Sequence, residues 1–179
     1  MYRLPLSWYS CGVLQREGPS VDQPSQEAAI SKVITVVGAA IVQKGRILCA
    51  QRGPGRALEG KWEFPGGKIE AGETSAEALM REIHEELRCS IQVGSRIETT
   101  TYEYDFGTIQ LTTYYAVLTD GHPTLTEHSH LTWFGQDQLA DLDWAPADIP
   151  AAEALQQADL HEIEARLQAG AAASADNDD

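Results

Sequence analysis

The sequence predicts an α+β fold in which a mixed β-sheet lies between helices, in three layers (α/β/α). Two observations support this prediction. Runs rich in β-branched residues alternate with segments whose apolar residues recur at helical spacing. Their order along the chain is two strands, a loop, a helix, three strands and a second helix. Strands mixed with helices in this way pack as a sheet covered on both faces.

The strands are predicted from apolar and β-branched runs bounded by turn residues. The first two form a hairpin that turns at Lys44 and Gly45, and residues 53–60, which contain three glycines and a proline, form a loop. The predicted extended segments are 33–42, 46–52, 62–64, 91–93, 96–104, 108–118 and 131–134.

The clearest helix is predicted over residues 75–87. Thr74, followed three residues later by Glu77, is a capping-box pattern. The residues expected on its buried face recur at helical spacing and are Ala76, Leu79, Met80, Ile83 and Leu87. A second helix is predicted from Ala151 to about Leu167, with Pro150 in its first turn.

Composition predicts a single folded domain with two additions. Residues 33–168 carry the periodic pattern and form the domain. Residues 1–32 show little periodicity and are expected to be a flexible N-terminal extension. Residues 169–179 are small and acidic, so they bury too little apolar area to offset their ordering entropy and are expected to be a disordered tail.

The charge balance limits the classes of partner. The chain has 13 Lys and Arg against 27 Asp and Glu, a net charge of −14, which argues against nucleic-acid binding. Small phosphorylated ligands remain compatible, because a bound metal can supply positive charge. Three cysteines without CxxC or zinc-ligand spacing predict a reducing, cytoplasmic location, and no apolar run predicts a membrane span or signal peptide.

One face of the first helix is strongly acidic. Glu82, Glu85 and Glu86 share that face, where like charges repel. The glycine-containing segment from Gly67 to Glu73 leads directly into this helix. A hard divalent cation, Mg²⁺ or Mn²⁺ as a substitute, would relieve the repulsion and leave positions for phosphate. The alternative for the glutamates taken alone is a solvated acidic face.

The spacing of these residues resembles a known family. Gly67, Glu73 and the run Arg81-Glu82-Ile83-His84-Glu85-Glu86 match the signature of the Nudix hydrolases. The resemblance extends to Gln51-Arg52, to Trp62-Glu63-Phe64-Pro65-Gly66-Gly67 and to residues 145–150, which are similar to the MutT-like nucleoside triphosphate pyrophosphohydrolase branch. It implies the Nudix fold over most of the domain. The sequence departs from the family where Arg88 and Cys89 replace the usual glycine and apolar residue.

The resemblance also implies roles for individual residues. It implies metal binding by Glu82, Glu85 and Glu86, with the carbonyl of Gly67 joining them. Arg81 resembles the residue that orients a catalytic glutamate. Glu127 is implied to bind metal or to act as a general base. Arg52 and Lys68 are implied to contact phosphate. For Arg52 and Glu127 the alternative is an ordinary surface position. The reaction implied is attack of water at a phosphorus, releasing a nucleoside monophosphate and pyrophosphate.

Base recognition is expected around Asp148. An ionised carboxylate only accepts hydrogen bonds, so it suits the adjacent N–H donors of guanine and 8-oxoguanine, whereas cytosine would require a protonated Asp148. Asp148 can equally cap the helix that follows. Trp62 and Phe64 are candidates for stacking with the base, with core packing as the alternative. His128 and His130 are expected in a solvent-exposed loop, with metal binding as the alternative.

We therefore expect a Mg²⁺-dependent enzyme that cleans the nucleotide pool of 8-oxo-dGTP or another modified nucleotide, a role in DNA replication and repair. The alternatives are a CTP, dCTP or 5-methyl-dCTP pyrophosphohydrolase, hydrolysis of ADP-ribose or dinucleoside polyphosphates, and a non-catalytic nucleotide-binding module. An interaction domain that uses the N-terminal extension as a docking arm is a further alternative. The sequence leaves a monomer and a homodimer equally open.

Overall fold

A computed structural model describes residues 33–126 and 128–175 of the chain. The strands are β1 (Val33–Gln43), β2 (Arg46–Gln51), β3 (Trp62–Glu63), β4 (Gly66–Lys68), β5 (Ser90–Tyr104), β6 (Gly107–Asp120) and β7 (His130–Gly135). The helices are α1 (Ser75–Leu87), the 3₁₀ helix η1 (Gln136–Asp141), α2 (Ile149–Leu155) and α3 (Leu160–Ala175). None of these helices is both long enough and apolar enough to span a membrane.

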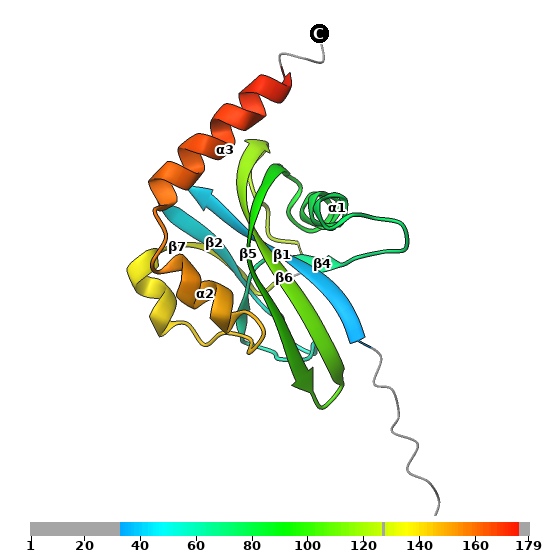
Figure 1. The fold of residues 1–179 in the computed structure, drawn as a ribbon. Helices are drawn as coiled ribbons and strands as arrows, with labels where there is room; N and C mark the ends of the chain where they lie inside the picture. The colour runs from blue at the N-terminus through cyan, green and yellow to red at the C-terminus, as the bar shows by residue number, and fades with distance from the viewer. Residues whose placement is uncertain (1–32, 127, 176–179) are drawn as a thin grey trace, which may run out of the picture. The chain divides into compact units, whose positions relative to one another are not determined.

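The sheet is mixed, as predicted. Its main path runs in the order β3-β2-β1-β6-β5, with β4 paired to β1 and β7 paired to β2 (Figure 1). β1 pairs with β6 in parallel and with its other neighbours in antiparallel orientation. β1 is therefore central, which explains its nearly continuous apolar sequence.

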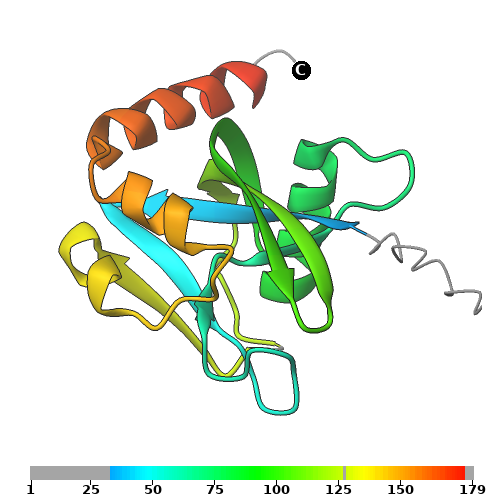
Figure 2. The same cartoon turned by 60° about the horizontal axis from the view of Figure 1, so that its bottom comes forward.

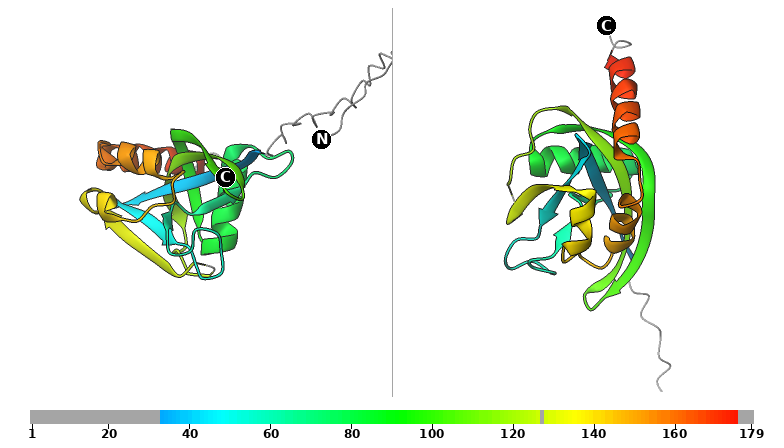
Figure 3. Two further views of the ribbon diagram at one scale, coloured as in Figure 1. Left: turned by 90° about the horizontal axis from the view of Figure 1, so that it is seen from below. Right: turned by 90° about the vertical axis from the view of Figure 1, so that its left-hand side faces the viewer.

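Helices cover both faces of the sheet, so the predicted three-layer arrangement is confirmed (Figures 1 and 3). Alternate side chains of β1 enter two separate apolar clusters. Val37 and Ile41 pack with α1, whereas Ala40 and Val42 pack with α2 and η1. The alternation follows from the two-residue period of a strand.

α1 has the predicted bounds, and its capping box is present. The Glu77 N–H donates to Thr74 Oγ1 at 3.3 Å, and the Thr74 N–H donates to Glu77 Oε2 at 2.8 Å. The prediction for Met80 was wrong: its side chain is 42% exposed, and Ala78 is buried in its place. The helix ends at Arg88, which adopts the left-handed conformation that glycine favours, with φ 56°.

The prediction of one continuous second helix was also wrong, because residues 149–175 form two helices. α2 ends at Leu155, and α3 starts at Leu160. Asp159 precedes α3, and its Oδ1 accepts the Glu162 N–H at 3.0 Å. Asp159 and Glu162 have the spacing of a capping motif, a signal that apolar periodicity concealed. Residues 169–175, which were predicted to belong to a disordered tail, instead continue α3, because alanine favours the helix. Residues 176–179 of that tail lie outside the described residues.

The start of α3 is fixed to the β1–β2 turn. Glu164 accepts the backbone N–H groups of Lys44 at 2.9 Å and Gly45 at 3.2 Å. The His161 ring lies 2.8 Å from the position that a Cβ at Gly45 would occupy. This contact attaches the start of α3 to the end of the β1–β2 hairpin (Figure 1).

Candidate functional site

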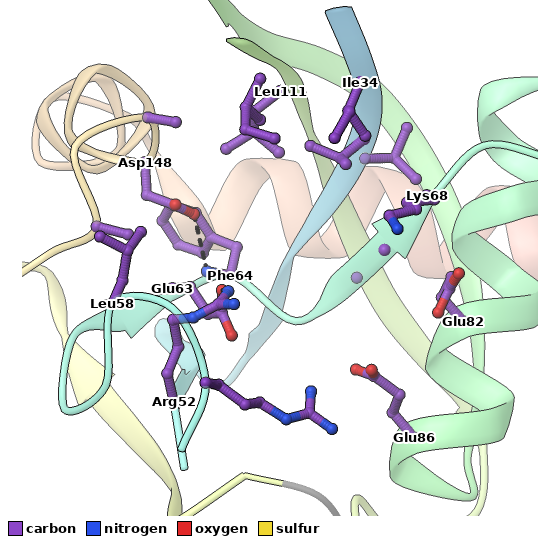
Figure 4. A pocket seen from close by; sticks show the side chains of 18 of the residues that line it. Ile34, Arg52, Leu58, Glu63, Phe64, Lys68, Glu82, Glu86, Leu111 and Asp148 are labelled. Atoms are coloured by element: carbon purple, nitrogen blue, oxygen red, sulfur yellow. Dashed lines mark hydrogen bonds and ion pairs between the residues drawn. The ribbon is translucent and has the colours of Figure 1, made fainter. Parts of the chain in front are cut away.

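A cavity of about 600 Å³ lies between the acidic face of α1, the β4 segment and the loops at the ends of β2, β5 and η1. Its floor is apolar and comes from β1 and β6, including Ile34 and Leu111 (Figure 4). The structure brings seven of the predicted site residues to its wall, namely Arg52, Phe64, Gly67, Lys68, Glu82, Glu86 and Asp148. Carboxylates of α1 lie at one end and Asp148 lies at the other (Figure 4).

Gly67 is required where α1 meets β4. A Cβ at Gly67 would lie 2.4 Å from Glu82 Oε2, far closer than two such atoms can approach. The absence of a side chain thus lets the Glu82 carboxylate lie directly against the backbone. Gly66 is equally constrained, because its Cβ would lie 2.1 Å from the Val37 carbonyl oxygen. Gly66 thus lets β4 lie against β1, and Gly67 lets the acidic face of α1 lie against β4.

Arg81 organises the carboxylates around this contact. Its Nε and Nη2 donate to the two oxygens of Glu73 at 2.7 and 2.9 Å, and its Nη1 donates to Glu82 Oε1 at 2.9 Å. The Lys68 carbonyl accepts a further bond from Nη2 at 3.0 Å. These hydrogen bonds from Arg81, joined by one from the Glu70 backbone, lower the pKa of Glu73 to about 2. Arg81 thereby fixes the loop, the strand and Glu82 relative to one another.

Glu85 differs from the other two helix glutamates. Its side chain is 60% exposed, and its carboxylate lies 3.6 Å from Arg81 Nη1. Glu82 and Glu86, in contrast, line the cavity. Within residues 33–126 and 128–175, no three acidic, His or Cys side chains form a ready-made metal cluster.

The donor set nevertheless fits a hard divalent cation. Glu82 and Glu86 supply only oxygen ligands, and the backbone of Gly67 lies against one of them. Glu127, the further predicted ligand, lies outside the described residues.

Arg52 is held by groups on its own side of the cavity. Its Nε donates to the Ala57 carbonyl at 2.6 Å, and its Nη1 forms an ion pair with Glu63. The other oxygen of Glu63 lies 3.2 Å from His128 Nε2. The His128 side chain is only 6% exposed, so the expectation of a solvent-exposed position was wrong for it. His130 is exposed, as expected, but it begins strand β7 and does not lie in a loop. The fold places His128 against Glu63 and so buries it.

Asp148 points into the cavity instead of capping α2. It occupies the N-cap position but makes no side-chain capping bond, and its Oδ1 accepts the Phe64 N–H at 3.0 Å. It is 5% exposed. Burial is the main cause that raises the pKa of Asp148 to about 8; the nearby Glu63 raises it further, while the Phe64 N–H and Arg52 oppose the shift. Asp148 is therefore largely protonated at neutral pH.

The two candidate stacking residues are separated by the fold. Phe64 is buried, lines the cavity and packs against Trp144 with ring centroids 4.8 Å apart. Trp62 is not part of the cavity wall and packs edge-on against Phe134 at 5.0 Å. For Trp62, core packing is the alternative that the structure supports.

The wall residues that were not among the predicted site residues include Glu63, Tyr104, Phe106 and His128. Tyr104 and Phe106 come from the β5–β6 hairpin, which projects on the same side of the molecule as the loop between β2 and β3 (Figure 2). Glu63 lies within the matched segment around Trp62 and could have been identified there. The hairpin aromatics carry no sequence signal of a site, because alternating aromatics are common in strands.

Comparison with known proteins gives matches over the same part of the chain. Residues 32–155 match the NUDIX domain. The chain is 39% identical over 125 residues to the CTP pyrophosphohydrolase of Escherichia coli, covering 69% of this chain and 91% of the relative. It is 31% identical over 121 residues to the 8-oxo-dGTP diphosphatase of the same species, covering 68% of this chain and 94% of the relative.

Solved structures show the same likeness. The solution structure of a MutT Nudix hydrolase from methicillin-resistant Staphylococcus aureus is 50% identical, with a TM-score of 0.61, covering 71% of this chain and 98% of that one. The solution structure of the Escherichia coli ORF135 protein is 37% identical, with a TM-score of 0.61, covering 69% and 89%. The fold predicted from the sequence is thus confirmed by its structural neighbours.

Proposed function

Because the chain belongs to the Nudix hydrolase family, we propose that it hydrolyses nucleoside triphosphates to the monophosphate and pyrophosphate in the cavity between α1 and Asp148. One observation carries this proposal. A single cavity joins the carboxylates of Glu82 and Glu86 to the buried carboxyl of Asp148 across an apolar floor. A nucleotide has the matching order of groups, with phosphates at one end and a base with a polar edge at the other.

We propose Mg²⁺ as the metal, with Mn²⁺ as a substitute. Glu82, Glu85 and Glu86 would hold it, together with the Gly67 carbonyl and, in the segment outside the described residues, Glu127. A bound divalent cation neutralises phosphate oxygens and lowers the pKa of an attacking water. The oxygen-only donor set supports Mg²⁺ over metals that prefer thiolate or imidazole ligands.

The chain's own groups would position the substrate. Arg81 holds Glu82 in place through the bond at 2.9 Å. Lys68 lies at the same end of the cavity as Glu82 (Figure 4), where its ammonium could contact phosphate. Arg52 would reach a phosphate oxygen only by sharing its guanidinium with Glu63, so its proposed phosphate contact has weaker support than that of Lys68.

Two base classes remain candidates. The first is 8-oxo-dGTP, with a role in cleaning the nucleotide pool before DNA replication; Asp148 would have to lose its proton on binding, so that its carboxylate accepts the two adjacent N–H groups of 8-oxoguanine. The raised pKa of Asp148, about 8, supports cytosine as a second candidate, because a protonated carboxyl donates to the ring nitrogen and accepts from the amino group. The relatives include both kinds of enzyme.

A non-catalytic nucleotide-binding module has less support. All the charged residues of the motif are retained, namely Glu73, Arg81, Glu82, Glu85 and Glu86. We also propose that free nucleotides in the cytoplasm are the substrate and that nucleic acid is not, given the net charge of −14.

The test is release of pyrophosphate from 8-oxo-dGTP, dGTP, dCTP and 5-methyl-dCTP with Mg²⁺ present, with release of AMP from ADP-ribose measured in parallel. We expect Glu86→Gln to reduce kcat by at least about 100-fold, because it removes a charge at the metal end without changing side-chain volume. The fold is checked by circular dichroism and thermal melting. The exposed Glu98→Gln substitution on β5 is a matched control that should leave kcat unchanged.

Two results would contradict the proposal. One is wild-type turnover in the folded Glu86→Gln variant, which would remove α1 from the active site. The other is the absence of pyrophosphate release from every triphosphate tested.

A further inference from the structure

Three aromatic side chains form a continuous ladder at the tip of the β5–β6 hairpin. The rings of Tyr104 and Phe106 are stacked, with centroids 4.9 Å apart and planes 7° from parallel. The rings of Tyr102 and Tyr104 lie 4.6 Å apart at 47°. The ladder ends in Phe106, which is 53% exposed.

The inner part of this ladder is joined to the segment that carries Asp148. The Ala147 N–H donates to the hydroxyl oxygen of Tyr104 at 3.0 Å. Burial is the main cause that raises the pKa of Tyr104, so its hydroxyl remains neutral at physiological pH. Tyr104 thus holds the hairpin tip beside the end of the cavity where base recognition is proposed.

Packing against Tyr104 leaves about half of the Phe106 side chain uncovered. Phe106 occupies the turn itself, leaves more than half its surface in solvent, and yet lines the same cavity as Glu82 and Asp148. An aromatic ring held parallel to a half-buried neighbour at a cavity wall offers a preformed surface for a planar ligand.

We propose that Phe106, held against Tyr104, forms a stacking wall for the base of the bound nucleotide. This inference rests on the proposed function, since it assumes that a nucleoside triphosphate occupies the cavity. Stacking does not depend on the hydrogen-bonding pattern of the base. Phe106 would therefore strengthen binding of all bases, while Asp148 discriminates between them.

The experiment measures binding by calorimetry, in the presence of Mg²⁺, of two inert analogues, α,β-imido-dGTP and α,β-imido-dCTP. Inorganic tripolyphosphate serves as the probe without a base. Phe106→Ala and Phe106→Leu should both weaken binding of the two nucleotides by about tenfold, the low end for loss of one stacked aromatic because this ring is half exposed. Binding of tripolyphosphate should stay unchanged, and Phe106→Tyr should bind like the wild type.

Two further comparisons separate stacking from other effects. Phe106→Leu retains apolar bulk at the turn, so it distinguishes loss of an aromatic face from loss of hydrophobic contact. Tyr102→Ala is the matched control, because Tyr102 belongs to the ladder but does not line the cavity. It should bind both nucleotides like the wild type.

The possible results lead to different conclusions. Wild-type nucleotide binding by Phe106→Leu, or equal weakening of tripolyphosphate binding, would overturn the stacking wall and leave the proposed function intact. A wild-type protein that binds tripolyphosphate but neither nucleotide would overturn both proposals. Equal weakening by Tyr102→Ala would show that the ladder only supports the hairpin.

Discussion

At the scale of single residues, Asp148 shows how the fold changes the chemistry of a side chain. In the sequence it precedes a predicted helix, where an ionised aspartate is a common cap. In the structure it is 5% exposed and accepts a bond from the Phe64 N–H instead. Burial disfavours the charged form, which is why its pKa rises to about 8.

This shift predicts a dependence of stability on pH. The folded protein binds the Asp148 proton more tightly than the unfolded chain, whose aspartate has its usual pKa near 4. The contribution of Asp148 to stability is therefore complete below about pH 4 and is lost as pH rises toward about 8. Asp148→Asn keeps an oxygen acceptor for Phe64 but does not titrate.

We expect Asp148→Asn to gain stability relative to the wild type as pH increases from 5 to 9, by more than about 1 kcal/mol. Denaturant unfolding at several pH values measures this difference. Parallel curves for the two proteins over that range would show that Asp148 has an ordinary pKa in the folded state.

At the scale of secondary-structure elements, α1 is the element that the sequence specified most completely. Its capping box, its bounds and the burial of Leu79, Ile83 and Leu87 all agree with prediction. Helical spacing alone could not place Met80, because that position lies at the edge of the apolar stripe and only the neighbouring elements decide whether it is covered. The same spacing concealed the break between α2 and α3.

The C-terminal end of α1 gives a second prediction. Arg88 adopts a left-handed backbone with φ 56°, a conformation that costs a residue with a Cβ more than it costs glycine. Arg88→Gly should therefore stabilise the protein by about 0.5–1 kcal/mol, after allowing for the greater entropy of glycine in the unfolded chain. Thermal and denaturant unfolding would measure the change.

Arg88→Ala is the matched control for this substitution. It removes the guanidinium but retains the Cβ, so it should not reproduce the gain. An equal gain in both variants would assign the effect to the arginine side chain and not to the backbone.

At the scale of the whole molecule, the cavity is assembled from segments far apart in the sequence. α1 and β4 supply its charged end, the β5–β6 hairpin supplies the ladder, and the segment before α2 supplies Asp148. The buried residues that form both apolar clusters lie between Val37 and Leu160.

Removal of residues 1–32 tests whether the folded domain is sufficient. We expect the shortened chain to retain its melting temperature, and its kcat/KM for a triphosphate substrate to change by less than about twofold. A large loss of kcat/KM with the fold intact would instead give the extension a part in substrate binding. A loss of melting temperature would place it in the folded domain.

The sequence by itself determined the family, the helix α1 with its glutamates and the three-layer fold. Each was predicted from the spacing of residues within single segments of the chain. Only the tertiary structure decided which residues share the cavity. It removed Trp62 from the wall, buried His128 and turned Asp148 away from its own helix toward Phe64. It also placed Phe106 at the wall. The physical reason is that exposure, pKa and the direction of a side chain depend on neighbours distant in the sequence, which periodicity and motif spacing do not encode.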